Sequence, residues 1–109
     1  MKILGKWRIT EASLWEADYL DLVEPAFIRF DDNGEGEMAY GAMTAYLNVA
    51  AKDDTVHFEW SGSDEGDEVG GDGWAELQSD GSIEGEISYH YSDETTFKAV
   101  PWPTSSTPC

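Results

Sequence analysis

The sequence predicts an all-β protein whose roughly eight antiparallel strands form an up-and-down meander closed into a small barrel. Short runs of alternating apolar and polar residues are typical of antiparallel strands with one buried face. Turn-forming residues separate these runs. An open meander would leave two unpaired edges, which closure removes, so a barrel is favoured and a two-sheet β-sandwich is the alternative.

The alternation delimits eight strands, in each of which every second residue is expected to face the interior. The clearest case sets Ile83, Gly85 and Ile87 against Glu84 and Glu86. The predicted strands are residues 5–10, 26–30, 34–40, 44–50, 55–61, 71–77, 82–91 and 95–100. The fourth run alternates less cleanly, so either of its faces could point inward.

Tight turns are predicted between the strands. "DDNG" at 31–34 contains Asn-Gly, the strongest short hairpin signal, and "QSDGS" at 78–82 carries Asp-Gly in the same role. "AKDD" at 51–54 and "YSDE" at 91–94 have aspartates where their side chains can cap the backbone of a type I turn. These short connections favour a meander.

The segment near residues 14–22 breaks the alternation and predicts one short helix. Ser13 and Glu16 have the spacing of a capping box, and Trp15 and Tyr19 fall on one helical face. We expect this helix to connect the first two strands and to cover one end of the barrel.

A chain of 109 residues is expected to form one domain, a β-barrel over residues 1–100. Residues 101–109 are rich in Pro, Ser and Thr and predict a flexible tail, anchored by Trp102. With Cys109 as the sole cysteine, no intrachain disulfide can form. No signal-peptide pattern or membrane-spanning apolar run is visible, so a cytoplasmic location is expected.

The charge balance is strongly acidic, with 23 Asp and Glu against six Lys and Arg and a formal net charge of −17. Such a surface repels phosphate groups, which argues against nucleic acids and anionic membranes as partners. It suits a basic partner protein, although most of these acids are expected simply to keep a β protein soluble.

Two resemblances bear on the fold. Gly5-Lys6-Trp7 resembles the Gly-x-Trp opening of lipocalin- and calycin-type barrels, which implies a calycin-like barrel with the tryptophan closing its floor. Residues 5 to about 100 resemble a group of small uncharacterised bacterial β-domain proteins, with counterparts of "GKWRI", "EPAFIRF", "EGDEVGGDGWAEL" and "GSIEGEI". That resemblance implies a compact β domain and assigns no activity.

Aromatic residues predicted to face inward could line a small-molecule site. If the barrel holds a small apolar or aromatic ligand, the expected lining residues, with Trp15 and Tyr19 as a lid, are Trp7, Tyr40, Phe58, Trp60, Tyr89 and Tyr91. The alternative is that their rings fill the core while the tyrosine hydroxyls lie at a barrel mouth.

The stretch "SDEGDEVGGDGWAE" at 63–76 concentrates carboxylates and glycines. Calcium prefers oxygen ligands, which Asp64, Asp67, Glu68 and Asp72 could supply. Their spacing matches neither an EF-hand nor a stacked calcium-binding repeat. A solvated turn between strands is therefore favoured, with glycines marking a bulge or close backbone approach, and a calcium-binding loop at 64–72 is the alternative.

Features of conventional enzymes are missing from the sequence. His57, His90 and Cys109 share no zinc-ligand spacing, and no nucleophile or phosphate-binding motif occurs. We therefore expect a non-enzymatic module, without a cofactor, that binds a small ligand or a protein. An acidic protein that docks a basic surface is the alternative, and the sequence does not indicate an oligomeric state.

Overall fold

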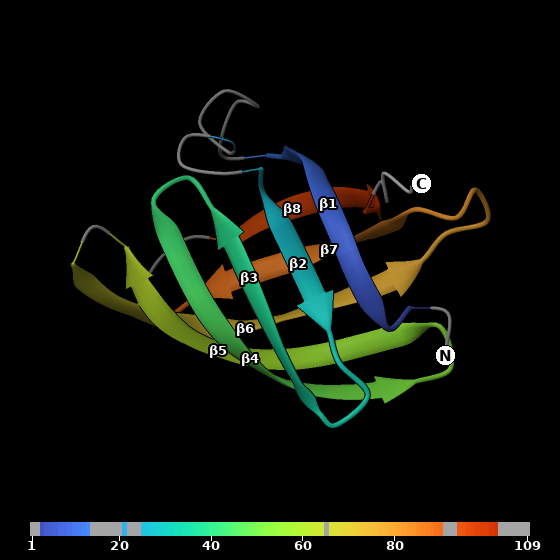
Figure 1. Cartoon of the computed structure of the whole chain (residues 1–109), viewed down its shortest axis with the longest axis horizontal. Coiled ribbons are helices and arrows are strands. Elements are labelled where there is room, and N and C mark those ends of the chain that lie inside the picture. Colours follow the sequence, from blue (N-terminus) through green and yellow to red (C-terminus); the bar gives the residue numbers. More distant parts are fainter. Residues whose placement is uncertain (1–2, 14–20, 22–24, 65, 91–93, 103–109) are drawn as a thin grey trace, which may run out of the picture.

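The computed structural model describes residues 3–13, 21, 25–64, 66–90 and 94–102. Its eight strands form a closed barrel in which each strand pairs with its neighbours in sequence and β1 closes against β8 (Figure 1). The strands are β1 (Gly5–Ala12), β2 (Phe27–Phe30), β3 (Glu35–Tyr40), β4 (Met43–Lys52), β5 (Thr55–Asp64), β6 (Asp67–Leu77), β7 (Ile83–Tyr89) and β8 (Glu94–Pro101). The prediction of a closed antiparallel barrel is confirmed, and the predicted helix near 14–22 lies outside the described residues.

Closure depends on β1, which pairs antiparallel with both β2 and β8. Trp7 lies opposite Ile28 on one side and Pro101 on the other. The β1–β8 register shifts between Ile9 and Glu11, and a bulge of this kind bends a strand and increases its twist. In Figure 1, β2 and β3 cross in front of β6 and β7 at a large angle.

The core is formed by the residues that the alternation directs inward. In β4, Ala45 and Leu47 are buried while Tyr46 is exposed, which settles the face that the sequence leaves ambiguous. In the first, second and fifth predicted strands, the residues expected to face inward are all buried, namely Trp7, Ile9, Ala26, Ile28, Phe30, Val56, Phe58 and Trp60.

Glycines make room for aromatic rings across the strands. Cross-strand pairs that place an aromatic residue opposite a glycine are Phe30–Gly36, Phe58–Gly73, Trp60–Gly71 and Phe97–Gly85. A Cβ added at Gly73 would lie 2.6 Å from the Phe58 ring. The close backbone approach predicted for the glycines of β6 is therefore present, and it lets large rings fill a narrow barrel.

The hairpin turns predicted at 31–34 and 78–82 form where the sequence places them, whereas the turn predicted at 91–94 lies mostly outside the described residues. Asp31 N–H donates to the Glu35 carbonyl at 2.8 Å around the Asn33-Gly34 pair. Gly34 adopts a φ of 84°, a left-handed conformation that glycine takes without a Cβ penalty. Gly81, with a φ of 89°, follows the same pattern between β6 and β7.

The β5–β6 hairpin is longer than the sequence predicts. Pairing continues to Asp64 opposite Asp67, leaving two residues in the turn. Most of the acidic stretch expected to be a loop is therefore strand. β8 likewise extends to Pro101, the first residue of the predicted tail, whereas residues 103–109 are outside the described part.

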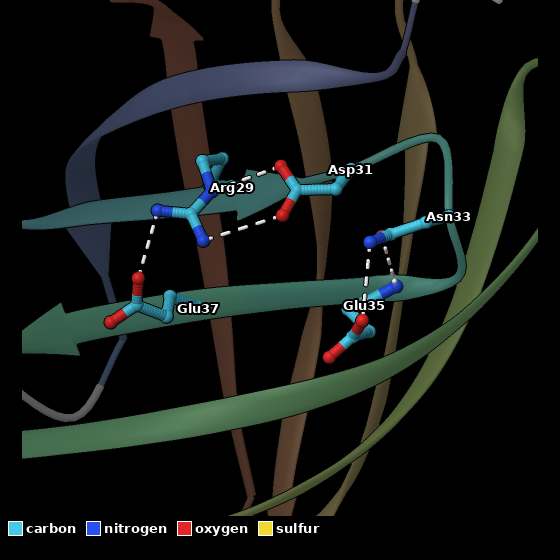
Figure 2. A network of polar contacts seen from close by, with 5 residues as sticks. All are labelled: Arg29, Asp31, Asn33, Glu35 and Glu37. Carbon is cyan, nitrogen blue, oxygen red and sulfur yellow. Dashed lines mark hydrogen bonds and ion pairs between the residues drawn. The ribbon is translucent and has the colours of Figure 1, made fainter.

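Arg29 of β2 holds the β2–β3 hairpin together (Figure 2). Its Nε lies 3.0 Å from Asp31 Oδ1, and its Nη1 lies 2.8 Å from Oε1 of Glu37, its cross-strand partner. The hydrogen bond to Asp31 is the main cause of a raised pKa for Arg29. Next to this group, Asn33 bonds to both the side chain and the backbone of Glu35.

A cation–π contact anchors the end of β8 to β1. Lys6 Nζ lies 4.0 Å from the ring centroid of Trp102 and 4.5 Å from that of Phe27. Trp102 N–H also donates to the Lys6 carbonyl at 3.1 Å, and the two rings meet edge to face. The expectation that Trp102 anchors this segment agrees with these contacts.

We expect Lys6→Met to lower the free energy of unfolding by about 0.5–1 kcal/mol, because it keeps the aliphatic stem and removes the cation above two rings. Urea denaturation measures the change, and Trp102→Ala in the same background tests the coupling. Lys52→Met, at the exposed end of β4, is the matched control with an expected change near zero. Equal effects of the two lysine substitutions would contradict a cation–π anchor.

Candidate functional site

The residues predicted to line a ligand cavity lie mainly in the core. Trp7, Tyr40, Phe58 and Trp60 are at most 4% exposed, and Tyr89 is half-buried. The other predicted residues, which lie outside the described part of the chain, are Trp15, Tyr19 and Tyr91.

The polar groups of these aromatic residues have hydrogen-bond partners within the barrel. The Tyr40 and Tyr89 hydroxyls lie 2.5 Å apart, and Tyr89 packs edge to face on Trp60 with ring centroids 5.0 Å apart. Trp7 Nε1 donates to the Ile3 carbonyl at 2.9 Å. Across the described residues, every buried side-chain nitrogen and oxygen has a hydrogen-bond partner. The rings thus act as core, the alternative that the sequence analysis left open.

The acidic stretch does not gather its carboxylates at one point. Asp64 faces Asp67 across the turn, whereas Asp72 lies further along β6, opposite Glu59. Glu68 pairs with a serine of β5. Within the described ranges, no group of three or more His, Cys, Asp or Glu is placed to hold a metal ion. The calcium-binding loop therefore stays a prediction without a structural counterpart.

An exposed tryptophan on the outside of the barrel is the feature that sequence reasoning missed. Gly73 and Ala75 face inward on β6, so Trp74 between them faces outward and is 37% exposed. Its Nε1 donates to Glu86 Oε1 at 3.0 Å. The signal was present in "GDGWAEL", where the alternation puts Trp74 on the polar side, between Asp72 and Glu76.

The β-sheet register places Trp74 in the middle of a row of outward-facing residues. This Trp74 row, which crosses β4 to β8, consists of Ala50, His57, Trp74, Glu86 and Thr96. The row on one side consists of Asn48, Glu59, Asp72, Ser88 and Glu94, and the row on the other of Lys52, Thr55, Glu76, Glu84 and Lys98. We call these three rows together the Trp74 face.

Two open hollows flank Trp74, which lines both. The first, of about 460 Å³ and here named the β5–β6 hollow, is lined by Asn48, Ala50, His57, Phe58, Glu59, Asp72, Gly73, Trp74 and Ser88. The second, of about 450 Å³, lies toward β8 and is lined by Glu11, Ala12, Ser13, Trp74, Glu84, Gly85, Glu86, Thr96, Phe97 and Lys98. An aromatic side chain between two hollows is a natural contact point for a partner.

The charges of the Trp74 face are not balanced. Glu59 lies directly opposite Asp72, and Glu76 directly opposite Glu84, although like charges in these positions repel. Among the described residues, the ion pairs involve only two cations, Arg8 on β1 and Arg29 on β2. The acidic residues lining the second hollow, Glu11, Glu84 and Glu86, share it with Lys98, whereas no described lysine or arginine lines the β5–β6 hollow beside Glu59 and Asp72.

Comparisons with known proteins give no relative. No protein-family model, curated protein or solved structure matches the chain. The relationships to calycin-type barrels and to small bacterial β-domain proteins therefore stay predictions. In the described residues, no helix is long and apolar enough to cross a membrane.

Proposed function

We propose that the protein is a non-enzymatic interaction module that docks a basic protein segment on the Trp74 face. The observation that carries the proposal is the exposed Trp74, which lies between two hollows and among carboxylates that form no ion pair with a described residue. Aromatic residues provide much of the binding energy at protein interfaces, and charge complementarity steers and selects the partner.

Charge decides which occupant fits. At a net charge of −17, a second copy of this chain, a nucleic acid and an anionic membrane would all be repelled. A basic segment would instead relieve the repulsion between opposed pairs such as Glu59 and Asp72. The proposal therefore commits to a lysine- and arginine-rich protein segment.

The test uses a capped peptide of about 20 residues with equal numbers of lysine, arginine and glycine, and measures affinity by calorimetry. We expect Trp74→Leu to weaken binding about tenfold, and an increase from about 20 to about 300 mM salt to weaken it at least as much. Circular dichroism checks that the variant keeps its fold, which the exposed position of Trp74 favours.

A matched pair of double variants separates a site from general acidity. Glu59→Gln/Asp72→Asn removes two charges from the Trp74 face, and Asp32→Asn/Asp67→Asn removes two from exposed positions outside that face. The first pair should weaken binding several-fold more than the second. Equal weakening by both, or no binding at low salt, would overturn the proposal.

A further inference from the structure

We propose that the Trp74 face selects arginine over lysine, with one guanidinium seated in the β5–β6 hollow between the Trp74 ring and the Glu59–Asp72 pair. This inference rests on the proposed function and specifies the partner chemistry. It follows from the fixed position of the indole, the spacing of the two carboxylates and the distribution of charge along the face.

Trp74 is held in place before any partner binds. Its only polar group, the indole N–H, already donates to Glu86, so it offers a partner its ring and no hydrogen bond. The planar guanidinium stacks on aromatic rings and is more weakly hydrated than an ammonium group. A fixed and partly exposed indole therefore favours arginine.

The two carboxylates have a spacing that suits a planar fork of donors. Glu59 and Asp72 are direct cross-strand partners, and such pairs have Cβ atoms about 4.5–5.5 Å apart. Neither side chain forms a hydrogen bond or ion pair with a described residue. The five N–H donors of a guanidinium can engage two carboxylates at once, whereas an ammonium acts as a point charge.

The face also sets the direction and length of the bound segment. The Trp74 row crosses five strands, which at the usual strand spacing span about 19 Å, the length of about six extended residues. In the second hollow, Lys98 lies directly opposite Glu84 and already supplies a positive charge, whereas no described lysine or arginine lines the β5–β6 hollow. The arginine is therefore placed at the β5–β6 end, with the rest of the segment running along the row.

The experiment compares three capped six-residue glycine peptides that carry two arginines, two lysines or two citrullines. Affinities for the full chain are measured by calorimetry at about 20 mM salt. We expect the arginine peptide to bind about fivefold to tenfold more tightly than the lysine peptide, and the citrulline peptide to show no measurable binding. In Glu59→Gln/Asp72→Asn, the preference for arginine should disappear, whereas Asp32→Asn/Asp67→Asn should keep it.

The possible outcomes separate this inference from the proposed function. If the arginine and lysine peptides bind with equal affinity, the selectivity is wrong while docking of a basic segment still holds. If neither binds, and the longer mixed peptide also fails, both proposals are wrong. A preference for arginine that survives in Glu59→Gln/Asp72→Asn would place the guanidinium elsewhere and overturn the assignment to the β5–β6 hollow.

Discussion

Phe58→Ala is expected to lower the free energy of unfolding by about 3–5 kcal/mol, because it removes a buried ring and leaves a cavity. The ring packs against Phe30 with centroids 5.9 Å apart and covers Gly73 on the neighbouring strand. Since Gly73 has no side chain, nothing on that strand can move in to fill the space. The loss in free energy of unfolding should therefore lie toward the upper end of the range for a phenylalanine-to-alanine substitution.

Urea denaturation of the full chain measures this loss, and Tyr46→Ala provides the control. Tyr46 is on β4 like the cross-strand partner of Phe58, but it is 72% exposed, so its truncation should change stability by less than about 0.5 kcal/mol. A Phe58→Ala variant within about 1 kcal/mol of the unmodified protein would show that the barrel interior is not packed as described.

The barrel could be predicted from the sequence because each strand repeats the same local signal. A period of two fixes which residues face inward, and Asn33-Gly34 and Asp80-Gly81 mark turns through their own backbone preferences. Closure follows from a general argument about unpaired edges. These features depend on neighbours in sequence, so one chain is enough to infer them.

Other features depend on register, which the sequence does not state. The β5–β6 hairpin extends to Asp64 and Asp67 because backbone pairing outweighs the turn preference of the glycines and acids beside them. The Trp74 row likewise exists only because five strands align, from Ala50 to Thr96. A residue-by-residue analysis marks each position as outward but cannot show which of them are adjacent.

The same limit explains why the sequence predicts a candidate site inside the barrel, whereas the structure indicates one on its outer surface. Inward aromatic residues were compatible with a ligand cavity or a filled core, and the alternation cannot distinguish the two. The distinction comes from glycines paired across strands with Phe58 and Trp60, which allow the rings to occupy the interior. With these rings in the core, the exposed aromatic residues on the described outer surface include Tyr46 and Trp74, and Trp74 is the one that lines the two hollows.

Gly71→Ala tests that packing directly and is expected to cost about 3 kcal/mol or more, or to prevent folding. A Cβ at this position would overlap the Ser88 carbonyl oxygen of β7 and lie 3.1 Å from Nε1 of Trp60. The obstacle is backbone, so it cannot rotate away as the end of a flexible side chain would. Relief requires β6 and β7 to separate, which disrupts their hydrogen bonds.

Gly70→Ala is the matched control, one residue away on the same strand. Its added Cβ would lie 3.1 Å from the Trp60 carbonyl oxygen, a tight contact without overlap, so the expected change is below about 1 kcal/mol. Both variants carry the same glycine-to-alanine substitution, so denaturation compares the two positions directly. Circular dichroism detects a failure to fold. Similar stabilities for Gly70→Ala and Gly71→Ala would mean that β6 and β7 do not approach closely at Gly71, and the account of a barrel filled by rings over glycines would be wrong.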